Sequence, residues 1–179
     1  GYDNVKVEEI ASDAGVAKGL VFYHFVSKEG LLSEIIQLES KKMFLHFMEF
    51  IKNMPPDYAL YQLFQGMFTS THSIGICKGF FEGDIPEKYH YAIDKAREET
   101  VFPVIHSLIK QGYDKKFFQI EELDISYDII SRGFANFLNT HFDLFQDKKY
   151  YKRFLISAAY ILNATLAPSR FKFEFSINN

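Results

Sequence analysis

One stretch near the start of the chain restricts the possible folds more than any other. Apolar residues recur there one helical turn apart, at Val7, Ile10, Ala11 and Ala14. Gly15 follows directly, so the spacing predicts a short helix that ends in a sharp turn with positive φ. A second helix is expected over residues 17–25, with Val21 and Phe25 facing inward. Two helices joined in this way form a helix-turn-helix, whose second helix enters the DNA major groove.

The rest of this unit has a predicted core and predicted helix caps. Four residues are expected to pack inside it rather than to touch DNA: Ile10, Val16, Val21 and Phe25. Position 6 holds Lys6 instead of a capping side chain, so Asn4 or Asp3 is expected to cap the first helix. Ser27 is expected to cap a third, longer helix.

In order and spacing, these residues resemble the DNA-binding part of the TetR family of transcriptional regulators. The segments that carry the resemblance are Gly1-Tyr2, Ile10-Ala11, Ala14-Gly15-Val16, Lys18-Gly19, Phe22-Tyr23-His24-Phe25 and Lys28-Glu29 with Leu31 and Leu32. They cover roughly the first 35 residues. The family has a helix before this point, so we expect the first helix of the head to be missing from this sequence. Leu20 replaces a polar residue of the family, which shifts base readout toward thymine methyl groups.

The resemblance implies six DNA-contacting residues: Lys18, Gly19, Phe22, Tyr23, His24 and Lys28. Lys18 has no acidic residue nearby in the sequence, so we expect it to contact bases or phosphates. A glycine inside a helix lowers its stability by about 1 kcal/mol relative to alanine. Close approach of the helix to DNA would explain why position 19 nevertheless holds Gly19. Tyr23 and His24 are expected to donate to phosphate oxygens, and Lys28 to add charge at a helix N-terminus. The competing interpretations are a solvated lysine, a tolerated glycine and a half-buried histidine.

Composition and the absence of known motifs argue against several other classes of function. The net charge of −3 neither supports nor excludes DNA binding, but residues 14–28 contain two lysines and no acidic residue. The six histidines and the single cysteine, Cys77, have no metal-ligand spacing, and the chain has no phosphate-binding glycine loop or nucleophile elbow. We therefore expect no metal, no cofactor and no enzymatic activity. The absence of a long apolar run or a signal peptide, together with one cysteine, favours a cytoplasmic protein without membrane contact.

The remainder of the chain predicts an all-α body. Helices are expected over residues 28–53, 58–71, 86–111, 123–145 and 148–167, with a bend at Pro103 and Gly112 at the end of the third. The segment Phe171–Phe175 alternates apolar and polar residues, which indicates an extended arm. We divide the chain into a helix-turn-helix DNA-binding domain, residues 1–38, and a helical ligand-binding and dimerisation domain, residues 39–179.

Aromatic residues are unusually frequent in this body. The chain has twenty Phe and eleven Tyr, more than simple packing at helical spacing requires. The resemblance implies a ligand cavity. Small-molecule sites are mostly apolar with few polar anchors, so aromatic side chains are suited to line it. The candidates to line it are Phe44, Phe47, Phe64, Met67, Phe68, Phe80, Phe81, Tyr89, Phe102, Phe134, Phe137 and Tyr160. Ordinary core packing is the competing interpretation for all of them.

The last two predicted helices carry small residues among large ones. These are Ser131, Gly133, Ala135, Ser157, Ala158 and Ala159. Small residues let helices approach closely, and two helices from each subunit can form a four-helix bundle about a two-fold axis. The pattern favours a homodimer through these helices. Completion of the core of a single chain is the alternative.

Together the residues and the resemblance predict a ligand-responsive DNA-binding transcriptional regulator. A homodimer is expected to bind a palindromic double-stranded operator and act as a repressor, which an apolar small-molecule effector releases. The alternative is a helical lipid- or protein-binding module whose DNA-binding head only localises it. A cavity shaped for a ligand would favour the first interpretation.

Overall fold

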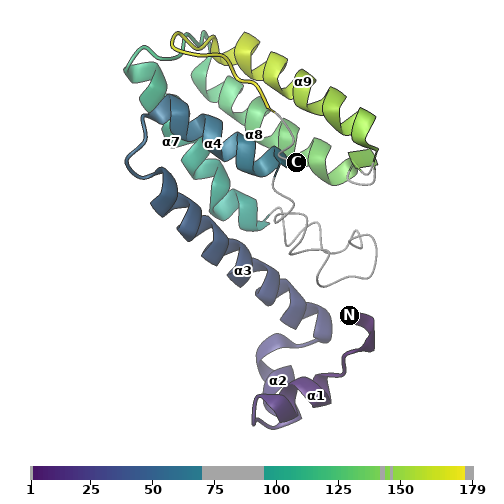
Figure 1. Ribbon diagram of the computed structural model, residues 1–179. Helices are drawn as coiled ribbons and strands as arrows, with labels where there is room; N and C mark the ends of the chain where they lie inside the picture. The colour runs from purple at the N-terminus through teal and green to yellow at the C-terminus, as the bar shows by residue number, and fades with distance from the viewer. Residues whose placement is uncertain (1, 70–94, 142–143, 146, 176–179) are drawn as a thin grey trace.

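The computed structural model describes residues 2–69, 95–141, 144–145 and 147–175, and every regular element in them is helical. A 3-10 turn at Tyr2–Asn4 precedes α1 (Val7–Asp13), α2 (Lys18–Phe25), α3 (Lys28–Ile51), α4 (Pro56–Thr69), α7 (Val101–Asp114), α8 (Leu123–Thr140) and α9 (Lys148–Leu166). Figure 1 shows α1 and α2 at one end of the molecule, joined by α3 to a body that contains α4, α7, α8 and α9. The predicted all-α class is confirmed. No helix in the described ranges has both the length and the hydropathy to cross a membrane.

The head has its own small hydrophobic core. Val7 and Ala11 of α1, Val21 of α2 and Leu31 of α3 are buried together. Ile10, Phe25 and Ile35 are partly buried against them. The apolar stripe of the sequence therefore packs as the spacing predicts, and the small Ala11 allows α1 and α2 to cross closely.

The cap of α1 differs from the prediction. The N-cap residue is Lys6, not Asn4 or Asp3, and the Lys6 N–H donates to Glu9 Oε2 at 3.1 Å. A glutamate three residues into a helix can reach back in this way, so a capping side chain at the N-cap is not required. The prediction for α3 is confirmed, because Ser27 Oγ accepts from the Gly30 N–H at 3.0 Å.

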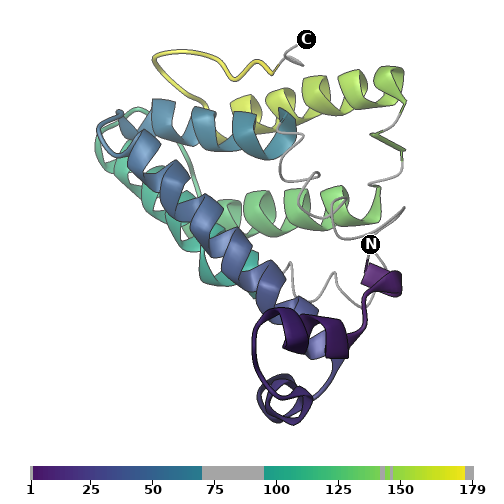
Figure 2. The ribbon, with the colours of Figure 1, turned by 60° about the horizontal axis from the view of Figure 1, so that its bottom comes forward.

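The body forms a second, larger core. Figure 2 shows α4 and α9 in one layer and α8 in another, with α3 crossing beside them. The side chains with almost no exposed surface include Leu60, Phe64, Ile105, Ile109 and Leu162. Ile51 at the end of α3 joins this cluster, while Ile36 is buried nearer the head. Since α3 runs unbroken from one core to the other, any tilt of α3 in the body moves the head.

The start and end of α7 depart from the sequence prediction. Residues 95–99 are helical, but the helix breaks at Thr100, and α7 begins at Val101. Pro103 lacks an N–H to donate to the carbonyl four residues earlier, so it breaks the helix there rather than bending it. Gly112 does not end α7; it is buried inside the helix, where the Phe118 ring occupies the space that a Cβ would need.

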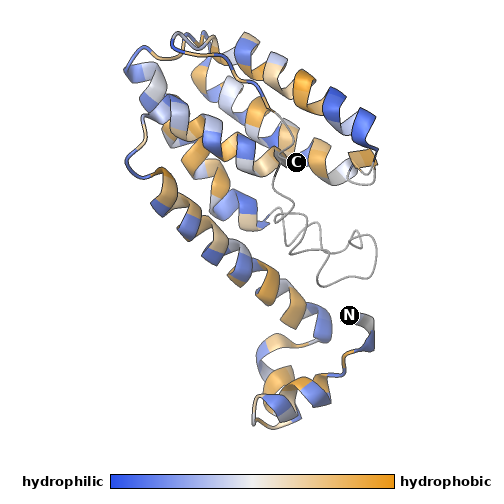
Figure 3. Ribbon diagram, in the orientation of Figure 1, coloured by the Kyte–Doolittle hydropathy of each residue, from blue (hydrophilic) through white to orange (hydrophobic). Residues whose placement is uncertain are grey.

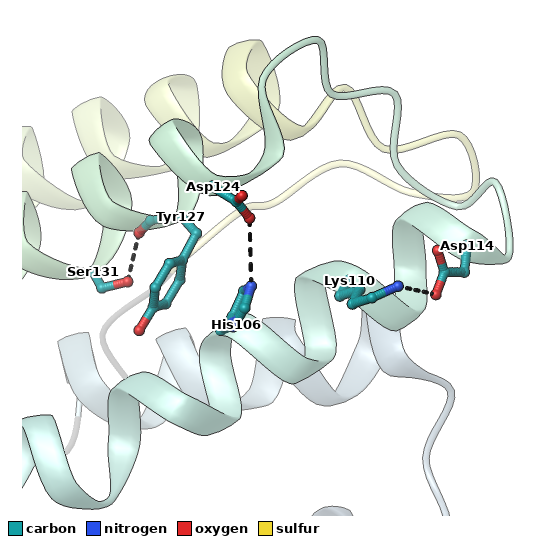
Figure 4. A network of polar contacts seen from close by, with 6 residues as sticks. All are labelled: His106, Lys110, Asp114, Asp124, Tyr127 and Ser131. Carbon is teal, nitrogen blue, oxygen red and sulfur yellow. Dashed lines mark hydrogen bonds and ion pairs between the residues drawn. The ribbon is translucent and has the colours of Figure 1, made fainter.

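Polar contacts join α7 to α8 at the surface of the body. In Figure 4 the His106 ring lies against Tyr127, with ring centroids 4.5 Å apart, and His106 Nε2 lies 3.8 Å from Asp124 Oδ1. Ser131 is buried, and its hydroxyl donates to the Tyr127 carbonyl at 2.6 Å. This bond satisfies a polar side chain that the core would otherwise leave unpaired.

The C-terminal segment is an extended arm, as predicted, but it pairs with no strand among the described residues. Phe173 is fully buried, and the Asn163 side chain brackets its backbone by accepting from its N–H at 2.8 Å and donating to its carbonyl at 2.9 Å. Tyr61 stacks on Phe175 and donates to the Glu174 carbonyl at 3.0 Å. The arm therefore covers α4 and α9 and completes the core (Figure 2).

Candidate nucleic-acid interface

The second helix of the head turns most of its side chains outward. Val21 is the buried residue of α2, at 8% exposure, and Phe25 is half-buried. The other side of the helix is exposed, and its members are Lys18, Gly19, Leu20, Phe22, Tyr23 and His24. Tyr23 is 80% exposed, which is unusual for an aromatic ring with no role at the surface. Five of the six predicted DNA-contacting residues thus share one solvent-facing surface.

The turn before α2 positions this surface. Gly15 has φ of +68°, and the Val16 N–H donates to the Ala11 carbonyl at 2.9 Å. Positive φ is cheap only for glycine, as the sequence predicted. The predicted core position of Val16 is wrong, because this side chain is 39% exposed. The corner is held by the backbone and not by an apolar plug.

Gly19 lies on this surface with open space around it. A Cβ built on Gly19 would meet no atom of the described residues within 4 Å. Packing within the chain therefore does not require a glycine here. The absence of a side chain matters only to something that approaches α2 from outside.

Lys18 has an acidic partner that the sequence analysis missed. Its ammonium donates to Glu8 Oε1 across the α1–α2 crossing, and the same Nζ lies 5.5 Å from the centroid of the Phe22 ring. This hydrogen bond is the main reason why the pKa of Glu8 lies below its usual value. The expectation of an unpaired Lys18 is wrong because the two residues are ten positions apart, and only the crossing of the helices brings them together.

The beginning of α3 supplies the remaining predicted contact. Lys28 is half-buried, with Nζ 4.3 Å from the centroid of the Tyr2 ring. An ammonium over a ring keeps its charge, so Lys28 remains able to attract a phosphate. His24 is exposed, and its ring lies 5.3 Å from the Tyr23 ring in an edge-on arrangement. The alternative of a half-buried histidine is therefore not favoured.

The link from α2 to α3 is a tight, strained turn. Val26 has φ of 62° and ψ of −42°, and the Ser27 N–H donates to the Phe25 carbonyl at 2.6 Å across it. This is a γ-turn with positive φ, which is rare for a β-branched residue. It sets the angle between α2 and the long helix.

The predicted ligand-pocket residues lie in several different places. Phe64, Phe68, Phe102 and Phe134 are buried in the body core, whereas Tyr160 is 74% exposed. Phe44 is half-buried on α3, and Phe47 and Met67 are partly buried against the core. Phe80, Phe81 and Tyr89 lie outside the described residues, as do Cys77 and the loop around it. Much of the aromatic surplus therefore packs the core.

A groove of about 450 Å³ lies between α8 and α9. Phe134 and Phe137 line it, and the sequence analysis missed the other lining residues: Ile129, Ile130, Gly133, Tyr150, Arg153, Phe154, Ser157, Ala158 and Ile161. Ile129 and Ile161 are 65% and 44% exposed, and so present apolar surface to solvent. The only signal in the sequence is the pattern of small residues among large ones, which the sequence analysis assigns to dimer contacts.

The predicted dimer residues divide between this groove and the core. Gly133, Ser157 and Ala158 line the groove. Ser131, Ala135 and Ala159 are buried within the single chain, at 1%, 4% and 9% exposure. These three pack α8 and α9 against the rest of the monomer. Half of the predicted set therefore faces the groove.

A helix-turn-helix with an outward second helix, carried by a long helix on an α-helical body, defines a DNA-binding regulator. Residues 1–35 match the family described as "Bacterial regulatory proteins, tetR family". The head of the chain is therefore similar to the DNA-binding part of TetR-type transcriptional regulators.

The fold resembles that of the transcriptional regulator FadR from Bacillus subtilis, which was solved in complex with stearoyl-CoA. The TM-score is 0.60 and the sequence identity 16%, over 93% of this chain and 90% of that one. At such a low sequence identity the comparison shows only that the two folds are similar. No curated protein sequence matches the chain.

Proposed function

We propose that the protein is a ligand-responsive repressor that binds a palindromic operator as a homodimer and leaves it when an apolar effector binds. The observation that carries the proposal is the outward face of α2. Lys18, Gly19 and Tyr23 are exposed on a helix that contributes one buried side chain, Val21, to the core of the head. Such a surface is explained by contact with DNA and not by the stability of the head.

Each residue of the head has a proposed role in this contact. Lys18 contacts bases or phosphates, Gly19 permits close approach, and Phe22 contacts bases or sugars. Tyr23 and His24 donate to phosphate oxygens, which positions α2 without specifying sequence. Lys28 holds a further phosphate at the N-terminus of α3, where free N–H groups favour an anion.

The test begins with selection of duplexes from a random pool by the full-length protein. Replacing Lys28 with Ala should weaken binding to every duplex and lower the salt slope by about 0.9 per head, because each head of the variant neutralises one phosphate fewer. Replacing Gly19 with Leu should abolish preference for the selected duplex. A Gly19→Leu variant that keeps full affinity for that duplex would refute the role of α2.

We propose the α8–α9 groove as the dimer contact, occupied by a second copy of the chain. Ile129 and Ile161 are exposed in its lining, and Ile125 and Ile156 are further exposed aliphatic side chains of the same two helices. A two-fold axis at this face would present two heads to two half-sites, as a palindromic operator requires. The groove floor contains Gly133, Ser157 and Ala158, which allow close helix approach.

Light scattering on the purified protein tests the dimer. The expected mass is about twice the chain mass of 20.9 kDa. Ile129→Glu should produce monomers, because it places a charge in the apolar contact. Leu45→Glu is the matched control, since Leu45 is 58% exposed on α3, away from this groove. A monomeric wild-type protein at micromolar concentration contradicts the proposal.

The effector proposal rests on apolar surface that the body leaves partly open. Phe44, Phe47 and Met67 on α3 and α4 are only half-buried, and Figure 3 shows hydrophobic residues recurring along the whole of α3. The similar fold of B. subtilis FadR was solved with stearoyl-CoA. We propose a long-chain acyl compound for this chain, bound where α3 faces the body, with α3 transmitting the change to the head.

Titration with stearoyl-CoA, with free coenzyme A as control, tests this step. Stearoyl-CoA is expected to weaken binding to the selected duplex by about 5- to 150-fold, the usual range of coupling between two sites. Coenzyme A alone should have little effect. Binding of stearoyl-CoA without a change in DNA affinity would favour the alternative, a lipid-binding module that its head only localises.

A further inference from the structure

We infer that Glu8 is a specificity-determining residue of the head, because it withholds Lys18 from the phosphates of DNA that lacks the cognate sequence. The inference rests on the proposed role of Lys18 in DNA contact. It concerns a residue of α1 that is absent from the predicted interface. The starting observation is the ion pair that joins Glu8 and Lys18 across the helix crossing.

The ion pair occupies the surface that DNA would approach. Lys18 is the first residue of α2, and its side chain is 51% exposed, while that of Glu8 is 56% exposed. The Phe22 ring lies 5.5 Å from the same ammonium. Lys18 is thus held between a carboxylate and a ring, and a phosphate oxygen must displace the carboxylate to accept from Lys18.

The charge balance of the head makes this competition important. Residues 14–28 contain only two lysines, Lys18 and Lys28, and no acidic residue. Glu8 therefore neutralises one of the two cations of this stretch from outside it. The Glu8 carboxylate is ionised at neutral pH, as an exposed glutamate is, and the hydrogen bond from Lys18 lowers its pKa further. A complex with non-cognate DNA is held by phosphate contacts alone. It therefore has one cation fewer to bind the phosphates, and the Glu8 carboxylate repels them.

The cognate complex depends less on this cation. Gly19 allows close approach, and Leu20 and Phe22 offer apolar contacts to thymine methyl groups, which require no charge. The same ion pair therefore lowers affinity for non-cognate DNA more than affinity for the cognate site. Its effect is to increase the ratio between the two affinities.

Two variants of α1 in the full-length protein test the inference. Glu8→Gln and Glu9→Gln each remove one negative charge from adjacent positions. Glu9 accepts from the Lys6 N–H, which glutamine can also do, and no contact joins Glu9 to Lys18 among the described residues. The probes are a random-sequence duplex and the duplex that wild-type protein enriches from a random pool, each titrated with salt.

Glu8→Gln is expected to bind the random duplex about two- to fivefold more tightly per head than Glu9→Gln does, the range of a surface ion pair. Its salt slope should be steeper by about 0.9 per head. Affinity for the enriched duplex should rise less, so specificity falls. Equal behaviour of the two variants, or an equal gain on both duplexes, overturns the inference.

The Lys18→Gln background separates this result from the proposed function. In that background Glu8→Gln should behave like Glu9→Gln, because the ammonium that Glu8 holds is gone. If Lys18→Gln alone leaves affinity for both duplexes unchanged, the proposed contact role of Lys18 fails. If Lys18→Gln weakens binding while Glu8→Gln matches Glu9→Gln, only the role of Glu8 fails.

Discussion

Gly19 and Gly112 both lie inside helices, yet the space around them differs completely. A Cβ at Gly19 would meet no atom within 4 Å in the described part of the chain, whereas one at Gly112 would collide with the buried Phe118 ring. Gly19→Ala should therefore stabilise the protein by up to about 1 kcal/mol, the gain in helix propensity. Gly112→Ala should destabilise it by about 1–3 kcal/mol through overpacking. Urea denaturation of each variant measures both changes.

DNA affinity gives Gly19 a second readout with the opposite sign. We expect Gly19→Ala to be more stable and yet weaker on the enriched duplex, since the added methyl group prevents close approach. The random-sequence duplex is the control, because a complex held by phosphate contacts alone depends less on close approach of α2. Gly19→Ala should lose less affinity for that duplex than for the enriched one. Equal DNA affinity of Gly19→Ala and wild type would argue against the role of Gly19.

The γ-turn at Val26 predicts another stabilising change. A residue with φ of 62° is strained unless it is glycine, and Val26 is 82% exposed, so it contributes little packing. Val26→Gly should raise the free energy of unfolding by about 1 kcal/mol or somewhat more. Thermal denaturation followed by circular dichroism measures it. Val5→Gly, at an exposed position before α1, should not be stabilising; an equal gain there would point to another cause.

At the scale of helices, periodicity predicted which segments are helical better than it predicted where they end. The apolar spacing correctly indicated α1, α2, α3, α4, α8 and α9. The ends depend on contacts that spacing does not contain. Pro103 acts on the turn before it, and Gly112 is a glycine because Phe118 packs on it, not because the helix stops.

In the candidate interface, too, some features could be predicted from the sequence and others could not. The outward face of α2 follows from helical geometry once Val21 is assigned to the core, so its residues were predictable. The Glu8–Lys18 pair arises from the crossing of α1 and α2 and has no short-range signal. The groove between α8 and α9 likewise depends on how large side chains divide between core and surface.

The C-terminal arm makes a testable contribution to the body. Asn163 provides both a donor and an acceptor to the backbone of the buried Phe173. Asn163→Ala leaves these groups unpaired and should cost about 1–3 kcal/mol per unsatisfied group. Asn163→Asp keeps an acceptor but loses the donor, so it should also destabilise. Urea denaturation measures both; unchanged stability of Asn163→Ala would show that the arm does not support the core.

Tyr151 links α9 to the end of α4, and the link should respond to alkaline pH. Its hydroxyl donates to the Phe68 carbonyl, and burial raises the pKa of this phenol above its usual value. The raised pKa means that the stabilisation is fully present below about pH 10 and is lost as pH rises through the folded-state pKa. Tyr151→Phe should cost about 0.5–1.5 kcal/mol at neutral pH and show a smaller alkaline loss than wild type. Equal pH profiles would contradict this.

For the whole molecule, α3 is the only described helix shared by the two cores. Figure 1 shows it spanning the distance between head and body. Lys41 and Lys42 are exposed residues midway along α3. Replacing both with Gly lowers the stability of the helix by about 1 kcal/mol per position relative to alanine. We expect the double variant to bind stearoyl-CoA normally but to show a reduced effect of stearoyl-CoA on DNA affinity.

The matched control replaces Lys41 and Lys42 with Ala. It removes the same two charges but keeps the helix strong, so the effect of stearoyl-CoA on DNA affinity should remain. Fluorescence anisotropy of the labelled duplex, with and without stearoyl-CoA, measures the coupling in each variant. Undiminished coupling in the glycine variant would mean that the signal does not pass through a stiff α3.

The outward face of α2 also bears on how such a head can change its target. Val21 and the half-buried Phe25 hold α2 in place, so the exposed residues at positions 18–20 and 22–24 contribute little to the packing of the head. We expect substitutions at these six positions to cost little stability beyond helix propensity, and those at Lys18, Leu20 and Phe22 to alter the DNA sequence that is preferred. New operators are therefore accessible by single substitutions from a folded ancestor, and a randomised library at these positions should yield mostly folded proteins from which altered preferences can be selected.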